Sequence, residues 1–99
     1  MMPDADMEMV GDAIMGSVFG SAGERCMAIS VVVPVGEGTG DNIKDIVKPK
    51  FENLKIGPGL DPDSEMGPLV TSDHLHKVQN YIDKGVEEGA DLVLSLIHI

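Results

Sequence analysis

Cysteine and positive charge are both scarce in this sequence of 99 residues. A single cysteine, Cys26, excludes an internal disulfide and a cysteine-rich zinc site, and it is compatible with a reducing compartment. Seven Lys and Arg residues stand against 17 Asp and Glu residues, which gives a formal net charge of −10. Because so acidic a chain repels phosphate backbones, we expect no binding to nucleic acid.

Long apolar runs are missing as well. None approaches the roughly 20 residues that span a bilayer, so we expect no membrane partner. The amino end shows no basic region followed by a hydrophobic core, so no signal peptide is predicted there. The length and the hydrophobic share of 42% are those of one small globular domain.

The one cysteine ends a loop of small residues at positions 20–26, Gly-Ser-Ala-Gly-Glu-Arg-Cys. Glycine at 20 and 23 permits positive φ and close approach of the backbone, so the loop can bring a side chain and its own N–H to one target. Arg25 places a permanent cation beside the sulfur in sequence, which favours the thiolate if the fold joins the two. We interpret Cys26 as a nucleophile. A small buried packing residue is the alternative.

Helical spacing precedes this loop. Pro3 to Asp6 has the character of a helix start, and apolar residues then recur at helical intervals up to Phe19, where Gly20 should end the helix. A second helix is predicted from Ile43 to Leu54, with a kink or break at Pro49. A third follows Thr71 or Ser72, which can cap it, and should stop between Gly85 and Gly89. Its inward residues are predicted to be Leu75, Val78, Ile82 and Val86.

Two stretches have the character of buried strands. Residues 29–35 form an almost unbroken β-branched run, which is typical of a strand covered on both faces in a parallel sheet. Residues 90–94 begin a second such strand. Between the first strand and the second helix, residues 36–41 are glycine-rich, yet Glu37 and Asp41 would repel pyrophosphate, so we interpret them as a flexible turn rather than a dinucleotide loop.

The segment around the cysteine resembles the active-site signature of the aldehyde dehydrogenase superfamily. In that pattern a glycine and then Gln or Glu precede the nucleophile by three and two positions, as Gly23 and Glu24 do here. Arg25 before the cysteine, and Met-Ala-Ile-Ser after it, are most similar to the CoA-acylating methylmalonate-semialdehyde dehydrogenase branch. The resemblance also includes Met-Gly-Pro-Leu at 66–69 and extends to about Leu94.

This resemblance implies an α/β fold. Residues 1–94 would be part of an aldehyde dehydrogenase catalytic domain, in the order helix, loop, strand, helix, helix, strand, with an incomplete parallel sheet. Residues 95–99 depart from the family pattern and are interpreted as a non-native tail, or as a strand that simply continues. Since two strands that are apolar on both faces need further strands and helices, we expect the isolated chain to be marginally stable and inactive.

The resemblance also implies a chemistry. Cys26 would attack an aldehyde, NAD would accept hydride, and coenzyme A would take the acyl group from the resulting thioester. Arg25 would bind the carboxylate of a small-molecule semialdehyde acid; an ion pair with Glu24 or another acid is the structural alternative. No cofactor-binding or metal-binding residue is identified in this chain.

Family members assemble as homodimers or homotetramers, and relatives of this branch occur in bacterial cytoplasm and in the mitochondrial matrix. Two other functions compete with the dehydrogenase. One is a non-catalytic acidic α/β module in which Cys26 only packs. The other is a cysteine hydrolase, which needs a positioned histidine, whereas the three histidines follow the cysteine at a distance without a matching motif. They are His74, His76 and His98.

Overall fold

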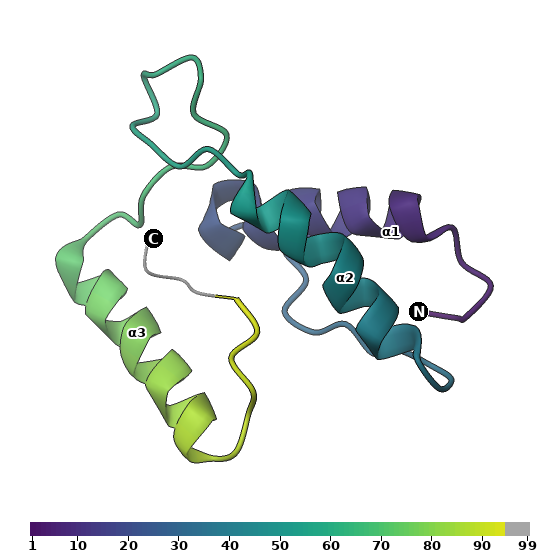
Figure 1. Ribbon diagram of the computed structural model, residues 1–99. Coiled ribbons are helices and arrows are strands. Elements are labelled where there is room, and N and C mark those ends of the chain that lie inside the picture. Colours follow the sequence, from purple (N-terminus) through teal and green to yellow (C-terminus); the bar gives the residue numbers. More distant parts are fainter. Residues whose placement is uncertain (95–99) are drawn as a thin grey trace.

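Three α-helices and two short helical turns make up the regular structure of residues 1–94, the part of the chain that this computed structural model describes (Figure 1). None of these helices has the length and apolar character needed to cross a membrane. In chain order the elements are α1 (Met7–Ile14), the π-helical turn η1 (Met15–Phe19), the 3-10 turn η2 (Gly20–Gly23), α2 (Thr39–Glu52) and α3 (Ser72–Glu87).

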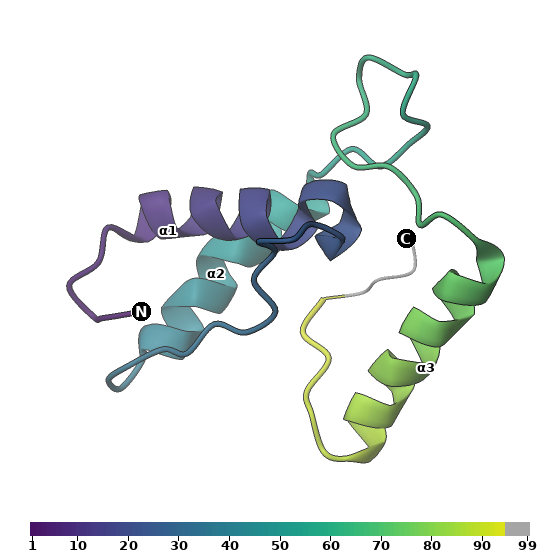
Figure 2. The same cartoon turned by 180° about the vertical axis from the view of Figure 1, so that it is seen from behind.

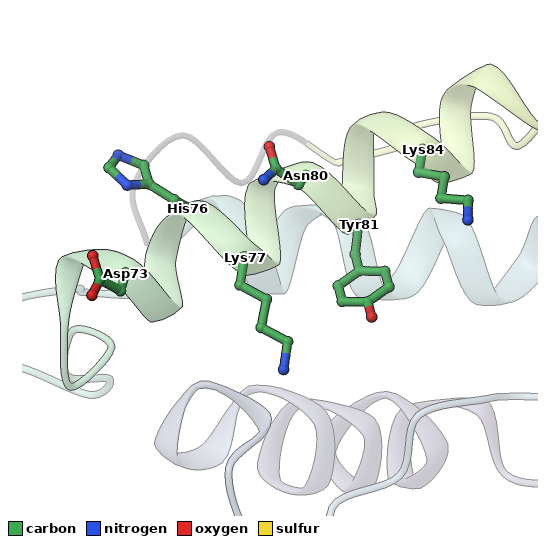
Figure 3. Close-up of a pocket in the computed structure, with 6 residues that line it drawn as sticks. All are labelled: Asp73, His76, Lys77, Asn80, Tyr81 and Lys84. Atoms are coloured by element: carbon green, nitrogen blue, oxygen red, sulfur yellow. The ribbon is translucent and has the colours of Figure 1, made fainter.

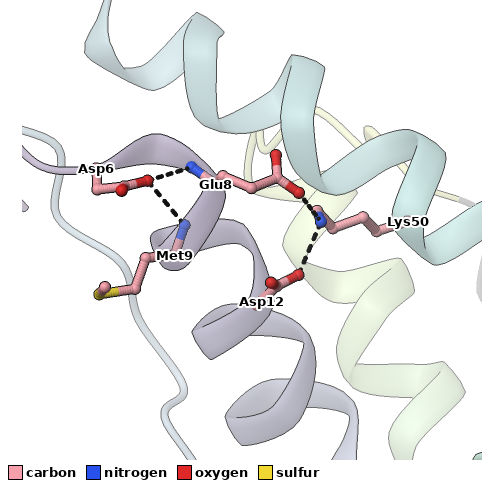
Figure 4. A network of polar contacts seen from close by, with 5 residues as sticks. All are labelled: Asp6, Glu8, Met9, Asp12 and Lys50. Atoms are coloured by element: carbon pink, nitrogen blue, oxygen red, sulfur yellow. Dashed lines mark hydrogen bonds and ion pairs between the residues drawn. The ribbon is translucent and has the colours of Figure 1, made fainter.

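The start of α1 agrees with the sequence prediction. Asp6 is its N-cap, and the Asp6 carboxylate accepts hydrogen bonds from the N–H groups of Glu8 at 3.0 Å and Met9 at 3.1 Å (Figure 4). These bonds satisfy amide groups that have no partner within the helix. The predicted single helix up to Phe19 is divided, because its last five residues form the wider turn η1.

Helices α1 and α2 lie side by side and enclose the small core (Figures 1 and 2). Ile14 of α1 and Val47 and Phe51 of α2 are buried. Gly11 allows the close approach, because a Cβ atom at this position would lie 2.5 Å from the Ile46 side chain. A glycine that weakens an isolated helix therefore has a packing role here.

A lysine from α2 joins the two helices at their polar edge. The Lys50 ammonium lies 2.6 Å from the Glu8 carboxylate and 2.7 Å from the Asp12 carboxylate (Figure 4). Hydrogen bonds first to Asp12 and then to Glu8 raise the pKa of Lys50 above its ordinary value. The two bonds join residues that are 42 and 38 positions apart in the chain.

Helix α2 begins before the predicted Ile43 and is not broken at Pro49. The buried Thr39 starts it, and the Thr39 hydroxyl donates to the carbonyl of Val35 at 2.9 Å. Pro49 falls in the last turn, so the single hydrogen bond that it removes leaves the helix continuous to Glu52.

Helix α3 stands apart from the other two helices in both views (Figures 1 and 2). Thr71 caps it, as the sequence predicts, by accepting from the His74 N–H at 3.2 Å. The predicted inward residues Leu75, Val78 and Ile82 are only half-buried, and Val86 is exposed. Amphipathic spacing thus predicts the helix correctly but not a covered apolar face.

The predicted strands are absent from residues 1–94. Residues 29–35 and 90–94 form no ladder, and the β-pairing in the described part of the chain is a single parallel bridge between Ile56 and Met66. The predicted incomplete parallel sheet is therefore not confirmed within the described residues. A strand requires a neighbour to receive its hydrogen bonds, and here Val31 and Val33 are exposed at 74% and 64%. The predicted tail, 95–99, lies outside the described residues.

Candidate active site

The cysteine loop, which we define as residues 20–27, follows directly from η1. Cys26 is a free, exposed cysteine, so the sulfur does not pack in the core formed by α1 and α2. The loop is anchored at its start, where the Phe19 ring packs against the Phe51 ring of α2 with centroids 4.9 Å apart. The core thus fixes where the loop begins, while the thiol remains accessible.

Three successive residues of this loop have left-handed backbone. Ser21 and Ala22 both have φ of 53°, and Gly23 has φ of 77°. Left-handed backbone is costly for a residue with a Cβ atom and is found at sites that need an unusual turn. The expected freedom at Gly23 is thus used, whereas Gly20 has an ordinary φ of −56°.

Gly20 lies against the Arg25 side chain. A Cβ atom at Gly20 would lie 3.2 Å from the guanidinium carbon of Arg25. The Arg25 Nε donates to the Ser21 hydroxyl at 3.3 Å, so this side chain folds back over the start of the loop. The alternative ion pair between Arg25 and Glu24 does not form.

Glu24 instead pairs with a histidine from the far end of the chain. Its carboxylate contacts Nε2 of His74, in the first turn of α3, and both side chains are a little over one third exposed. Glu24 and His74 are 50 positions apart in the sequence, and no local pattern predicts their contact.

The amides of Arg25, Cys26 and Met27, around the thiol, have no acceptor among residues 1–94. The Glu24 N–H donates to the Ser21 carbonyl at 2.9 Å, and the Ala28 N–H donates to the Arg25 carbonyl at 3.1 Å. The Cys26 N–H has no acceptor among residues 1–94. Thiol and amide of one exposed residue can therefore act on the same bound carbonyl group.

The glycine-rich turn at 36–41 does not fit a pyrophosphate. Glu37 is exposed on it, and Asp41 carries a negative charge in the first turn of α2. Lys44 lies 2.6 Å from the Asp41 carboxylate, and its hydrogen bond and charge lower the pKa of Asp41. Two carboxylates at this helix start would repel an anion, so the structure supports the interpretation as a turn.

Sequence reasoning missed a surface hollow of about 410 Å³ along α3 (Figure 3). The described residues that line it all belong to this helix and are Asp73, His76, Lys77, Asn80, Tyr81 and Lys84. Their spacing of three or four places them on one helical face, a signal that the sequence does contain. None belongs to the cysteine loop. His74 and His76 have separate surroundings, and no group of three metal-ligating side chains gathers within residues 1–94.

Comparison with known proteins places this geometry in a wider context. The family model described as "Aldehyde dehydrogenase family" matches residues 1–96. The malonate-semialdehyde dehydrogenase of Pseudomonas aeruginosa is 49% identical over 94 residues, which is 95% of this chain and 19% of that protein. The chain thus spans about a fifth of the length of the curated relatives that it matches.

Solved structures give the same result. A Sinorhizobium meliloti protein complexed with NAD matches with a TM-score of 0.91 and 49% identity, over 95% of this chain and 19% of that one. The methylmalonate-semialdehyde dehydrogenase of Oceanimonas doudoroffii also matches with a TM-score of 0.91, at 41% identity over the same shares. In sequence and in backbone path, this chain belongs to the aldehyde dehydrogenase family.

Proposed function

We propose that this chain is the cysteine-bearing part of an NAD-dependent, CoA-acylating malonate- or methylmalonate-semialdehyde dehydrogenase, with Cys26 as its nucleophile. The observation that carries the proposal is the exposed Cys26, whose thiol shares one turn with its own N–H, a donor that has no acceptor among residues 1–94. The names of the relatives described above support this substrate class.

The first step is addition to the aldehyde. The Cys26 thiolate attacks the carbonyl carbon, the sulfur–carbon bond forms, and the carbonyl electron pair moves to oxygen. The Cys26 N–H then donates to the resulting oxyanion, which a second donor from the rest of the enzyme would also stabilise. The product is a thiohemiacetal on Cys26.

Arg25 suits the second functional group of a semialdehyde acid. Its guanidinium can bind a carboxylate through two parallel hydrogen bonds. It lies one residue from the nucleophile, and its hydrogen bond to the neutral Ser21 hydroxyl leaves the guanidinium without a carboxylate partner among residues 1–94. We therefore assign the substrate carboxylate to Arg25.

When bound, NAD supplies the acceptor for the hydride that leaves the thiohemiacetal carbon, and a thioester on Cys26 remains. No residue of this chain is assigned to hold NAD, since the turn at 36–41 does not fit it. The acyl group then carries a carboxylate β to the thioester carbonyl. Loss of carbon dioxide sends the carbon–carbon electron pair into that carbonyl, and the carbon atom is then protonated.

Coenzyme A completes the proposed sequence as the acyl acceptor. Its thiolate attacks the thioester carbonyl, and the Cys26 thiolate leaves. The products are acetyl-CoA from malonate semialdehyde and propionyl-CoA from methylmalonate semialdehyde. The overall reaction balances, because one aldehyde, one NAD and one CoA thiol give one acyl-CoA, one NADH and one carbon dioxide.

A hybrid enzyme tests the proposal. In it, this chain replaces the segment that it matches in the Pseudomonas aeruginosa malonate-semialdehyde dehydrogenase. We expect NADH and acyl-CoA formation from malonate semialdehyde, and mass spectrometry of the enzyme without coenzyme A should find an acyl group on Cys26. Cys26→Ala should abolish both.

The control is the unaltered relative, examined by the same thermal melt. A hybrid that melts as this control does, and yet forms neither NADH nor a Cys26 adduct, would contradict the proposal. Acyl transfer to water instead of coenzyme A would retain Cys26 as nucleophile but reject the CoA-acylating branch.

A further inference from the structure

We propose that Glu24 and His74 form a positioning pair that holds the cysteine loop against the first turn of α3. The pair acts on Cys26 through the loop and does not itself touch the substrate. Its catalytic consequence rests on the function proposed above.

The pair connects two parts of the chain that are otherwise separate. Glu24 lies two residues before Cys26, and His74 lies in α3, which packs on neither α1 nor α2. Among residues 1–94, this contact is the ion pair that joins the loop to α3. The other ion pair made by an α3 residue, between Lys84 and Glu88 at 3.8 Å, stays at the end of the same helix.

The geometry of the loop gives the contact a role. Ser21 and Ala22 have left-handed backbone, which is unfavourable unless surrounding contacts hold it. Before these residues, Phe19 packs on Phe51. After them, the first side chain that reaches another element is Glu24. The two contacts enclose the first half of the loop, and Cys26 follows two residues after the second contact.

The backbone on the His74 side is also fixed. The His74 N–H donates to the Thr71 hydroxyl at 3.2 Å, in the cap of α3. The imidazole therefore projects from the capped first turn of that helix. Neutral histidine can donate from Nε2 to a carboxylate, and protonated histidine does so with added charge, so the contact is favourable in both states.

The test uses the hybrid enzyme with Glu24→Ala, His74→Ala and the double variant, and compares kcat with the rate of Cys26 alkylation by iodoacetamide. Because both side chains are a little over one third exposed, the ion pair is weak, and we expect kcat to fall about two- to fivefold in each single variant. The kcat of the double variant should be no lower than that of either single variant, because all three variants lose the same contact. Alkylation of the exposed thiol should be unchanged, since it needs no defined geometry.

Two conservative variants separate positioning from general destabilisation. Glu24→Gln retains an acceptor and His74→Gln retains a donor, so each should restore most of kcat. Lys84→Ala is the matched control, because it removes an exposed ion pair of α3 that does not involve the loop. It should leave kcat unchanged.

Hydrogen exchange of the hybrid supplies a readout that does not depend on turnover. Amides of residues 20–28 and 72–76 should exchange faster in either single alanine variant than in the unsubstituted hybrid. The double variant should exchange at the same rate as the single variants. The positioning pair would be overturned if the increases in exchange rate in the two single variants added up in the double variant. It would also be overturned if exchange in the loop were unchanged. A hybrid without dehydrogenase activity would reject the proposed function, while exchange would still decide whether the pair exists.

Discussion

The Phe19 ring packs against the Phe51 ring with centroids 4.9 Å apart and an angle of 48° between the ring planes. Phe19 is the last residue before the cysteine loop, and Phe51 is buried between α1 and α2. This tilted pair links the position of the loop to the core. Effects of substitutions on stability and catalysis are measured in the hybrid enzyme.

Phe51→Ala should destabilise the protein by about 3–5 kcal/mol, because it removes a buried ring and leaves a cavity. It should also lower kcat, since the start of the loop loses its support. Phe51→Leu retains most of the volume and should cost clearly less. Urea unfolding and steady-state kinetics measure the two effects. Equal kcat in the wild type and Phe51→Ala would show that the core does not position the loop.

Gly11→Ala should destabilise by about 1–3 kcal/mol, although alanine is the better helix former. The new methyl group would meet the Ile46 side chain at 2.5 Å and force α1 away from α2. Gly16 is the matched control, because a Cβ atom there meets nothing within 4 Å. Thermal melts should show a lower melting temperature for Gly11→Ala and an unchanged one for Gly16→Ala. Tolerance of both changes would contradict the close packing of the two helices.

Lys50→Met should lower the melting temperature at neutral pH, because two carboxylates lose their shared cation. The pKa of Lys50 is raised in the folded state, so its contribution is complete below the ordinary value of 10.5 and is lost as the pH rises through the raised value. The difference in melting temperature between wild type and variant should therefore shrink at alkaline pH. A constant difference from pH 7 to 11 would assign the effect to packing alone.

Asp41→Asn should act at the opposite end of the pH scale. Lys44 lowers the pKa of Asp41 below 3.8, so the stabilisation is present above that value and is lost as the pH falls through the lowered one. The melting temperatures of wild type and variant should thus converge as the pH is lowered from 6 to 3. Because the pair is exposed, the difference at pH 6 should be small.

Arg25→Ala should weaken the use of semialdehyde acids while sparing simple aldehydes such as propanal. The ratio of kcat/KM for the two substrates measures this directly, and loss of a charged hydrogen-bond partner predicts a selective decrease of about tenfold or more. Ser21→Ala controls for the hydrogen bond that Arg25 makes within the loop. Equal losses on both substrates would indicate a structural arginine.

The isolated 99-residue chain should show no cooperative thermal transition by circular dichroism. Few side chains are buried, and aliphatic residues such as Val31, Val33 and Leu60 are largely exposed. Too little apolar surface is then removed from water to offset the loss of chain entropy. A sharp two-state melt of the chain alone would contradict this expectation.

Local sequence determined much of the structure. Asp6 and Thr71 start their helices as predicted, because a capping side chain acts within three residues. Helical spacing predicts the three helices for the same reason, and the residues around Cys26 indicate the family. The predicted strand at 29–35 is not confirmed, because a ladder depends on neighbours beyond these residues, however suitable the β-branched side chains are.

Tertiary structure alone decided which distant groups meet. The sequence determined that one thiol lies in a glycine-containing loop beside an arginine, and that a lysine and several carboxylates share the chain. It did not determine that Glu24 would contact His74, or that Lys50 would lie between Glu8 and Asp12. Such contacts depend on how the helices and loops are placed in space, which no local pattern encodes. The chemistry of each residue is therefore readable from the sequence, but its partner is fixed only by the fold.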